Sequence, residues 1–206
     1  MNEMSAVYPI NPRKTEYEIS PIFVNRWSPR AFTGEPVEDA ALFSLFEAAR
    51  WAPSANNSQP WRFIYAKNGG TGWDKLLGLA NENNRRWASR AGVLVALLSK
   101  KTHIRNGDTE PTPLRNHSLD AGAAWASLAF QAVHVGLATH AIGGFDRDNA
   151  PAVLGVPEGF QVEILIAIGK QGERAALPED IQAREQPTPR KPLANFYAEG
   201  QFNFKE

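Results

Sequence analysis

The first strong pattern along the chain is an apolar face with the spacing of a helix. Four apolar residues follow one another at i, i+3, i+4 and i+7, namely Leu42, Leu45, Phe46 and Ala49. Pro36 and Glu38 precede them, and both residue types are favoured in the first turn of a helix. Pro53 cannot continue a helix. The pattern therefore predicts an amphipathic helix that begins after Pro36 and ends before Pro53.

Short apolar runs elsewhere in the chain indicate strands. Residues 93–98 form an unbroken apolar run of strand length, which predicts a strand covered on both faces. Residues 161–168 form a second strongly apolar segment, and residues 62–66 predict a shorter strand before the turn Asn68-Gly69-Gly70. A fourth strand is expected within residues 138–145.

Helical patterns occupy most of the remaining length. The longest covers residues 118–136, and shorter helices are expected at residues 16–26, 73–80, 81–90 and 149–154. Residues 26–30 are expected to be extended, because Pro29 disfavours a helical conformation in the residue before it. Strands separated by helices, with no internal repeat, predict an α+β fold in layers, formed by one domain over residues 1–206.

Two segments lack a regular pattern. Residues 101–116 are polar and contain Pro111 and Pro113, which indicates a mobile loop, either an active-site lid or a surface excursion. Residues 171–206 are expected to form an extended tail, because their prolines exclude a regular core helix. The tail carries aromatic residues that need a surface to pack against, such as a second subunit: Phe196, Tyr197, Phe202 and Phe204.

Composition and charge exclude several classes of protein. The 206 residues include 22 basic and 22 acidic ones, so no overall field attracts nucleic acid or an anionic membrane. The absence of cysteine removes disulfides, thiolate metal sites and thiol nucleophiles. The four histidines lack metal-ligand spacing, so no metal site is expected. Residues 1–14 contain no apolar stretch of a secretion signal, and we expect a cytoplasmic protein.

One uncharged stretch, residues 121–141, is long enough to span a bilayer. It contains Ser127, Gln131 and His134 and is rich in alanine and glycine, whereas leucine, isoleucine and phenylalanine drive membrane insertion. We therefore expect a buried helix that runs into a strand, and no membrane partner.

Two polar segments carry groups that suit an anionic or heterocyclic ligand. Arg26, Ser28 and Arg30 lie close together in the chain, and a guanidinium group binds phosphate through two parallel hydrogen bonds. Taken alone, such an arginine pair is more often solvated on the surface. The loop from Pro53 to Trp61 is rich in amides, hydroxyls and prolines, which fits either a ligand with donor and acceptor edges or a plain helix-to-strand connection.

Two further pieces are weak signals by themselves. Gly143 and Gly144 either allow a ligand to approach the backbone closely or form an ordinary turn. Arg190 and Lys191 form a basic pair in the tail, where such pairs are usually solvated. The sequence contains no G-x-G-x-x-G fingerprint, no phosphate-binding loop and no G-x-S-x-G nucleophile elbow. A bound nucleotide would therefore be held by residues outside these known motifs.

In their order and spacing over residues 16–193, these pieces resemble the nitroreductase family. The motifs that carry the resemblance are R-x-S-x-R-x-F (Arg26, Ser28, Arg30, Phe32), A-P-S-x-x-N-x-Q-P-W (Ala52, Pro53, Ser54, Asn57, Gln59, Pro60, Trp61), N-x-x-W (Asn84, Trp87), G-L followed by G-F-D (Gly136, Leu137, Gly144, Phe145, Asp146) and R-x-P (Arg190, Pro192). The resemblance implies a mixed central sheet flanked by helices, and a tail that wraps around a dimer partner.

The resemblance also implies an FMN cofactor. Arg26, Ser28 and Arg190 would bind its phosphate, and Arg30 would lie near the N1–C2=O edge of the ring, where a cation stabilises the reduced flavin. Asn84 would hydrogen-bond to the pyrimidine edge. The remaining contacts implied by the resemblance come from Trp27, Gln59, Ala141, Gly143 and Gly144, and across a homodimer interface from Pro53, Ser54, Ala55 and Asn57.

Two positions depart from the pattern of the family. Trp87 stands where some relatives have a lysine, so that Arg30 would supply most of the charge near N1. Gly143 stands where some relatives have an acidic residue, which bears on donor binding.

The resemblance implies a ping-pong reaction in which NAD(P)H passes a hydride to flavin N5 and leaves. A nitroaromatic, quinone or similar oxidant then takes its place. The cofactor carries the chemistry, so no catalytic side chain is expected. Two alternatives stand beside this one: a specialised member of the family that performs enone reduction, dehalogenation or ring oxidation, and a flavin-binding carrier or sensor without turnover.

Overall fold

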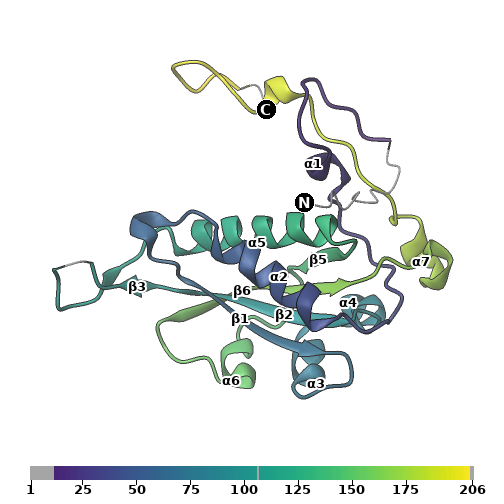
Figure 1. Cartoon of the computed structure of the whole chain (residues 1–206), viewed down its shortest axis with the longest axis horizontal. Coiled ribbons are helices and arrows are strands. Elements are labelled where there is room, and N and C mark those ends of the chain that lie inside the picture. Colours follow the sequence, from purple (N-terminus) through teal and green to yellow (C-terminus); the bar gives the residue numbers. More distant parts are fainter. Residues whose placement is uncertain (1–11, 106, 205–206) are drawn as a thin grey trace.

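Four strands form the central sheet, and every pairing between them is antiparallel (Figure 1). The computed structural model describes residues 12–105 and 107–204. The strands lie in the order β1 (Trp61–Lys67), β2 (Val93–Lys100), β6 (Phe160–Gly169) and β5 (Ala138–Ile142). All four predicted strands are therefore present, and the α+β class is confirmed.

The antiparallel pairing differs from the mixed sheet implied by the resemblance, as far as the described residues go. The reason lies in two connections, β1–β2 and β5–β6, each of which returns to the sheet at the same end of the strands that it left. Lys67 at the end of β1 pairs with Val93 at the start of β2, and the chain between them forms α3 (Trp73–Leu79) and α4 (Glu82–Ala88). A parallel pairing of two consecutive strands would require a connection that runs back along the length of the strands.

Helices cover both faces of the sheet (Figure 1). One face carries α2 (Asp39–Arg50) and the long α5 (His117–His134), and the other carries α3, α4 and α6 (Ala150–Leu154). Along β2, alternate residues enter the two resulting cores, with Val93, Val95 and Leu97 in one and Leu94, Ala96 and Leu98 in the other. The unbroken apolar run thus belongs to a strand buried on both faces, as predicted.

The predicted helices are also present, with small shifts at their ends. The first helix differs most from its expected length, because α1 covers only Pro21–Asn25 of the expected residues 16–26. Residues 101–116 were expected to form a mobile loop, and the structure shows that the segment contains a short hairpin, in which β3 (Thr102–His103) pairs with β4 (Thr112–Pro113). Strands of this length are too short to leave an alternating pattern in the sequence. Asn106, inside this segment, lies outside the described residues.

The helical segments in the described part of the C-terminal tail are short: η2 (Arg174–Ala176), α7 (Glu179–Gln182) and η3 (Leu193–Asn195). It leaves the body of the fold beside the N-terminal segment (Figure 1). Arg13 Nε donates to the Thr188 carbonyl at 2.9 Å, and the Leu193 amide donates to Glu16 Oε1 at 2.8 Å. We call these two paired segments, residues 12–20 and 187–204, the terminal arms. Three aromatic side chains on the C-terminal arm are largely exposed: Phe196, Tyr197 and Phe202.

The uncharged stretch 121–141 forms most of α5 and then runs into β5, as expected. The side of α5 that faces the sheet includes the buried Ala121, Ala124 and Leu128. In the described ranges, no helix combines the length and the apolar character needed to cross a bilayer. Of the N-terminal segment that lacks a secretion-signal pattern, residues 1–11 lie outside the described part of the chain.

Candidate functional site

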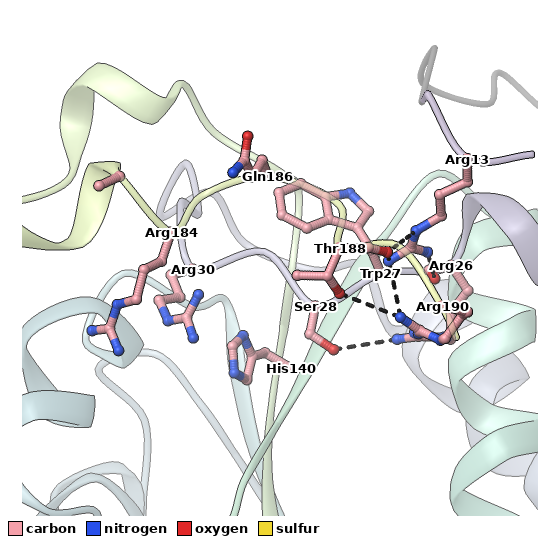
Figure 2. A pocket seen from close by; sticks show the side chains of 11 residues that line it. Arg13, Arg26, Trp27, Ser28, Arg30, His140, Arg184, Gln186, Thr188 and Arg190 are labelled. Carbon is pink, nitrogen blue, oxygen red and sulfur yellow. Dashed lines mark hydrogen bonds between the residues drawn. The ribbon is translucent and has the colours of Figure 1, made fainter. Parts of the chain in front are cut away.

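A basic pocket lies between the extended segment after α1 and the C-terminal segment around α7 (Figure 2). Its volume is about 450 Å³, within the range of small-molecule sites. We call it the arginine pocket, and it is lined by Arg13, Arg26, Trp27, Ser28, Arg30, His140, Ala183, Arg184, Gln186, Thr188 and Arg190. The structure thus brings together five of the predicted site residues: Arg26, Trp27, Ser28, Arg30 and Arg190.

Three guanidinium groups gather at one side of the arginine pocket, those of Arg13, Arg26 and Arg190 (Figure 2). Burial lowers the pKa of Arg26, and the charge of Arg190 lowers it further. The pKa of Arg13 is lowered by burial first, and then by the charges of Arg190 and Arg26. Arg26 Nη1 donates to Ser28 Oγ at 3.2 Å, which turns the guanidinium and the hydroxyl toward the same space. Mutual repulsion between like charges makes this side of the pocket favourable for an anion.

Arg30 and Arg184 lie at the other side of the pocket (Figure 2). Burial lowers the pKa of Arg30, the charge of Arg184 lowers it further, and the carboxylate of Glu185 partly opposes both effects. That carboxylate accepts hydrogen bonds from the backbone amides of Arg30 at 2.8 Å and Ala31 at 2.9 Å. It also lies 3.9 Å from Arg30 Nη1, and the residue is 7% exposed. Glu185 therefore fixes the position of Arg30, a role that the sequence did not indicate.

His140 lies between the two groups of arginines and is neutral at neutral pH. Its Nδ1 is 3.0 Å from the Pro29 carbonyl, which can only accept, so Nδ1 carries the proton and Nε2 is an acceptor. Burial lowers the pKa of His140 to about 4, and the charges of Arg30 and Arg26 act in the same direction. The ring of Trp87 lies 4.5 Å away, and that tryptophan also stacks on Phe32. The aromatic packing places His140 at the floor of the pocket.

The pH dependence of stability should reveal this neutral histidine. The folded-state pKa of about 4 lies below the ordinary 6.5, so the unfolded chain binds the extra proton between these values. The contribution of His140 is complete above pH 6.5 and is lost as the pH falls toward 4, by up to about 3 kcal/mol. Urea unfolding at several pH values should show a smaller loss over this range for His140→Asn than for the wild type. An imidazole that titrates near 6.5 in the folded protein would contradict the assignment.

Asn84 and Gly144 meet at a second place, where α4 faces the end of β5. Asn84 Nδ2 donates to the Gly144 carbonyl at 3.1 Å, and the Asn81 amide donates to the same oxygen at 3.0 Å. A Cβ on Gly144 would come within 2.9 Å of Asn84 Nδ2 and closer still to Asn81 Nδ2. The side chains of Asn81 and Asn84 therefore approach this backbone so closely that they leave room only for a glycine. Ala141 and Gly143 follow His140 along the chain and do not line the arginine pocket.

Substitutions of Gly144 and Gly143 should differ in their effect on the stability of the protein. We expect Gly144→Ala to lower stability by about 1–3 kcal/mol, because the new methyl group overpacks against the two asparagines. Gly143→Ala is the matched control and should be close to neutral, because nothing lies within 4 Å of the place that its new methyl group would take. Urea unfolding of both variants measures the difference. Equal stability of the two variants would show that the asparagines move away without cost.

The predicted loop Pro53–Trp61 lies at the opposite edge of the sheet. Trp61 pairs with Ser99, whereas His140 stands in register with Ala167, Leu94 and Ala66. Trp61 and Ala66 are roughly 16 Å apart along β1, and the two edges are further separated by the width of the sheet. Within one chain, the loop residues proposed to contact the cofactor are therefore not brought to the arginine pocket: Pro53, Ser54, Ala55, Asn57 and Gln59.

The loop itself is a rigid and strained piece of backbone. Its residues include the short turn η1 (Ala55–Asn57) and three non-glycine residues with positive φ: Asn56 at 52°, Asn57 at 51° and Gln59 at 46°. Ser54 Oγ accepts from the Gln59 amide at 3.1 Å, and Asp120 Oδ2 accepts from the Ala55 amide at 3.1 Å. Clustered unfavourable φ values held by such contacts are characteristic of binding sites. Turn-forming residues in the sequence did not reveal this strain.

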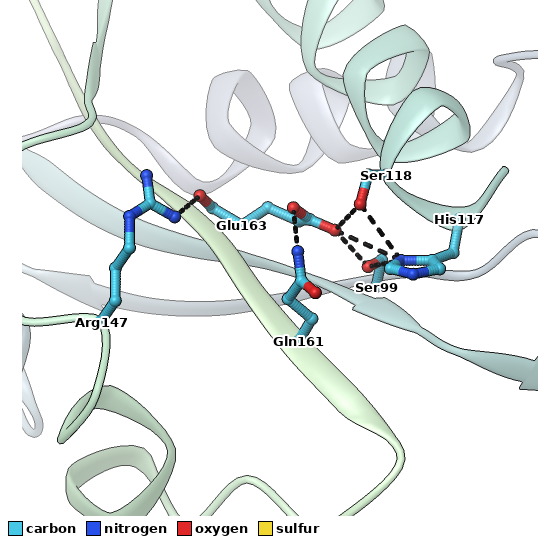
Figure 3. A network of polar contacts seen from close by, with 6 residues as sticks. All are labelled: Ser99, His117, Ser118, Arg147, Gln161 and Glu163. Atoms are coloured by element: carbon cyan, nitrogen blue, oxygen red, sulfur yellow. Dashed lines mark hydrogen bonds and ion pairs between the residues drawn. The ribbon is translucent and has the colours of Figure 1, made fainter. Parts of the chain in front are cut away.

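A serine, a histidine and a carboxylate form a polar network near the start of α5 (Figure 3). Ser99 Oγ lies 2.7 Å from His117 Nδ1 and donates to Glu163 Oε1, and Ser118 Oγ donates to the same carboxylate oxygen at 2.8 Å. Glu163 Oε1 is also 3.4 Å from His117 Nδ1. In a hydrolase triad the serine and the acid contact opposite nitrogens of the histidine. Here both approach Nδ1 and Ser99 is fully buried, so the network joins α5 to β2 and β6 instead.

Several known proteins are similar to this chain in sequence or in fold. The sequence model of the nitroreductase family matches residues 24–86 and 71–170. The crystal structure of an oxidoreductase containing FMN is similar, with a TM-score of 0.91 and 43% identity, over 96% of this chain and 99% of that chain. An uncharacterized 15.4 kDa protein of Mycolicibacterium smegmatis is 36% identical over 141 residues, which are 65% of this chain and 90% of that protein. The NADH dehydrogenase of Thermus thermophilus is 26% identical over 196 residues, which are 82% of this chain and 92% of that protein.

Proposed function

Since this chain belongs to the nitroreductase family of oxidoreductases, we propose that it binds FMN in the arginine pocket and passes electrons from NAD(P)H to a small organic oxidant. The oxidant would be a nitroaromatic, a quinone or a similar acceptor, taken up after the donor has left in a ping-pong sequence. The observation that carries the proposal is the convergence of five arginines on one pocket. The similar oxidoreductase of known structure contains FMN, which supports the same cofactor here.

The side of the pocket formed by Arg13, Arg26 and Arg190 fits the phosphate end of FMN. Arg26 and Ser28 already turn their polar groups toward the same space, and Arg190 supplies a further charge. A phosphate dianion would replace the repulsion between these cations with charge-assisted hydrogen bonds, each worth about 1.5–3 kcal/mol. Arg13 adds to the set predicted from the sequence.

The opposite side of the pocket fits the ring of FMN. Arg30, fixed by Glu185, would face the N1–C2=O edge and offset the negative charge that the ring gains on reduction. When bound, FMN supplies the hydride chemistry, so no side chain has to act as a nucleophile or a base. His140 stays neutral and offers Nε2 as an acceptor at the floor of the pocket. Asn84 and Gly144 would meet the ring from the end of β5.

The remaining wall of the site would come from a second copy of the chain. The loop 53–59 is rigid, partly exposed and remote from the arginine pocket of its own chain, which suits a contact made across an interface. The exposed aromatic residues on the C-terminal arm need a surface to cover them: Phe196, Tyr197 and Phe202. We propose a homodimer in which the tail wraps around the partner and each pocket receives the partner's loop.

The proposed turnover is tested by reduction and reoxidation of the bound flavin. In the absence of oxygen, excess NADPH or NADH should bleach the visible absorbance of the purified protein, and a quinone should restore it. A flavin that stays oxidised with both donors would identify a carrier or sensor and would exclude the proposed turnover. If the reduced flavin is reoxidised by an enone or a halogenated acceptor but not by a quinone, the protein is a specialised member of the family.

A further inference from the structure

A second cavity lies between the strained loop and the β3–β4 hairpin. Its volume is about 630 Å³. We call it the hairpin pocket, and it is lined by Asn56, Asn57, Ser58, Gln59, Pro60, Arg62, Lys100, Thr102, His103, Ile104 and Arg105. None of these residues lines the arginine pocket, so the two cavities are separate in one chain.

The ionisable side chains that line the hairpin pocket are all basic. They are Arg62, Lys100, His103 and Arg105, and the lining includes no aspartate or glutamate. Among the residues that the structure describes, Arg62, Lys100 and Arg105 take part in no ion pair. Arg62 Nη1 donates to the carbonyls of Gln59 at 3.1 Å and Trp61 at 2.7 Å, which leaves its charge without a carboxylate. The pocket therefore has the charge of an anion site, in a chain whose overall charge is balanced.

Both walls of the hairpin pocket are fixed to the first turns of α5. Asp120 holds the loop wall through the Ala55 amide at 3.1 Å. His117 holds the other wall, because its Nδ1 contacts Ser99, which directly precedes Lys100 (Figure 3). The Lys100 amide also donates to the Pro60 carbonyl at 2.9 Å, which joins the two walls directly. These contacts fix both walls of the cationic pocket in the absence of a ligand, and preorganised sites lose less free energy on binding.

We propose that the hairpin pocket binds the phosphate groups of the pyridine dinucleotide donor and that its cations favour NADPH over NADH. The inference rests on the proposed function, which places loop 53–59 against the partner's flavin. A donor held on residues 56–60 would have its nicotinamide end beside that flavin. The chain has no G-x-G-x-x-G fingerprint, so the donor's phosphates need another set of partners. NADPH carries one phosphate more than NADH, which adds a dianion for Lys100 and Arg105 to bind.

Calorimetric titration of the FMN-loaded, full-length protein with adenosine 2′,5′-bisphosphate tests the site without turnover. Lys100→Ala and Arg105→Ala should each raise its Kd about tenfold, since each removes a charge-assisted hydrogen bond. Lys101→Ala is the matched control, because Lys101 is exposed in the same segment but does not line the pocket, and its Kd should be unchanged. Binding should weaken as salt is added. A Kd that is the same in all three variants, or no binding to the wild type, would overturn the proposal.

Two further measurements identify the ligand and separate this proposal from the function on which it rests. Lys100→Ala and Arg105→Ala should raise the KM for NADPH more than the KM for NADH; equal changes would overturn the selectivity. Inorganic phosphate that binds as tightly as the bisphosphate would show a general anion site and overturn the assignment to a dinucleotide. Flavin that neither donor reduces would defeat the proposed function, whereas variant-sensitive binding of the bisphosphate would still establish the hairpin pocket as a nucleotide-phosphate site.

Discussion

Arg26→Ala is expected to yield a colourless protein. The side chain is partly buried beside Arg190, and it already contacts Ser28 within the pocket. Its removal would take away a charge-assisted contact to the FMN phosphate worth about 1.5–3 kcal/mol, which corresponds to a loss of affinity of roughly 10- to 150-fold. Arg190→Ala should act in the same direction. The measurement is the flavin absorbance per chain of the purified variants, followed by titration of the apoprotein with FMN.

Lys191→Ala is the control for the two arginine variants. Lys191 neighbours Arg190 in the chain, is exposed and does not line the arginine pocket, so this variant should stay yellow. If Arg26→Ala purifies with a full complement of FMN, the phosphate lies elsewhere and the assignment is wrong. If all three variants lose their colour equally, the general positive charge of the arm matters and the individual contacts do not.

Glu185→Ala is expected to have the largest effect on stability. The carboxylate is buried and accepts from the amides of Arg30 and Ala31, so its removal leaves two donors without their acceptor. Each unsatisfied buried donor costs about 1–3 kcal/mol, and we expect a loss of about 2–5 kcal/mol in the free energy of unfolding. Urea unfolding measures it directly.

Two further variants distinguish the role of Glu185 from a general effect of charge. Glu179→Ala removes an exposed carboxylate from nearby α7 and should change the free energy of unfolding by less than about 0.5 kcal/mol. Glu185→Gln keeps one acceptor oxygen and should recover part of the lost stability. A Glu185→Ala variant as stable as the Glu179→Ala control would show that the two amides find other acceptors.

The regular elements of the fold could be predicted because their patterns are local. Helix α2 has four apolar residues on one face, and β2 is an unbroken apolar run, so each segment carries its own signal. The β3–β4 hairpin was missed, because each of its strands has only 2 residues. The antiparallel pairing was also missed, since pairing depends on how the connections return to the sheet and not on any one strand.

The candidate site could be predicted only where its residues stand close together in the chain. Arg26, Ser28 and Arg30 form a recognisable motif, and the structure places them in one pocket. Glu185 lies 155 residues from Arg30, and no spacing rule connects a single glutamate with an amide so far away. The same holds for the contact between Ser99 and Glu163. Long-range polar contacts of this kind are set by the fold, and they decide how rigid each pocket is.

The arginine pocket draws its charges from both ends of the chain, so binding of the proposed anion would be coupled to the pairing of the terminal arms. Arg13 and Arg26 come from the N-terminal side, and Arg184 and Arg190 come from the C-terminal side. Of these, Arg13 and Arg190 lie on the terminal arms, so the repulsion between their charges opposes the pairing of the arms, whereas a shared anion would favour it. By linkage, an anion that binds only when the arms are paired would also stabilise their pairing. On the proposed function, the paired terminal arms would therefore be more stable in the FMN-loaded protein than in the apoprotein.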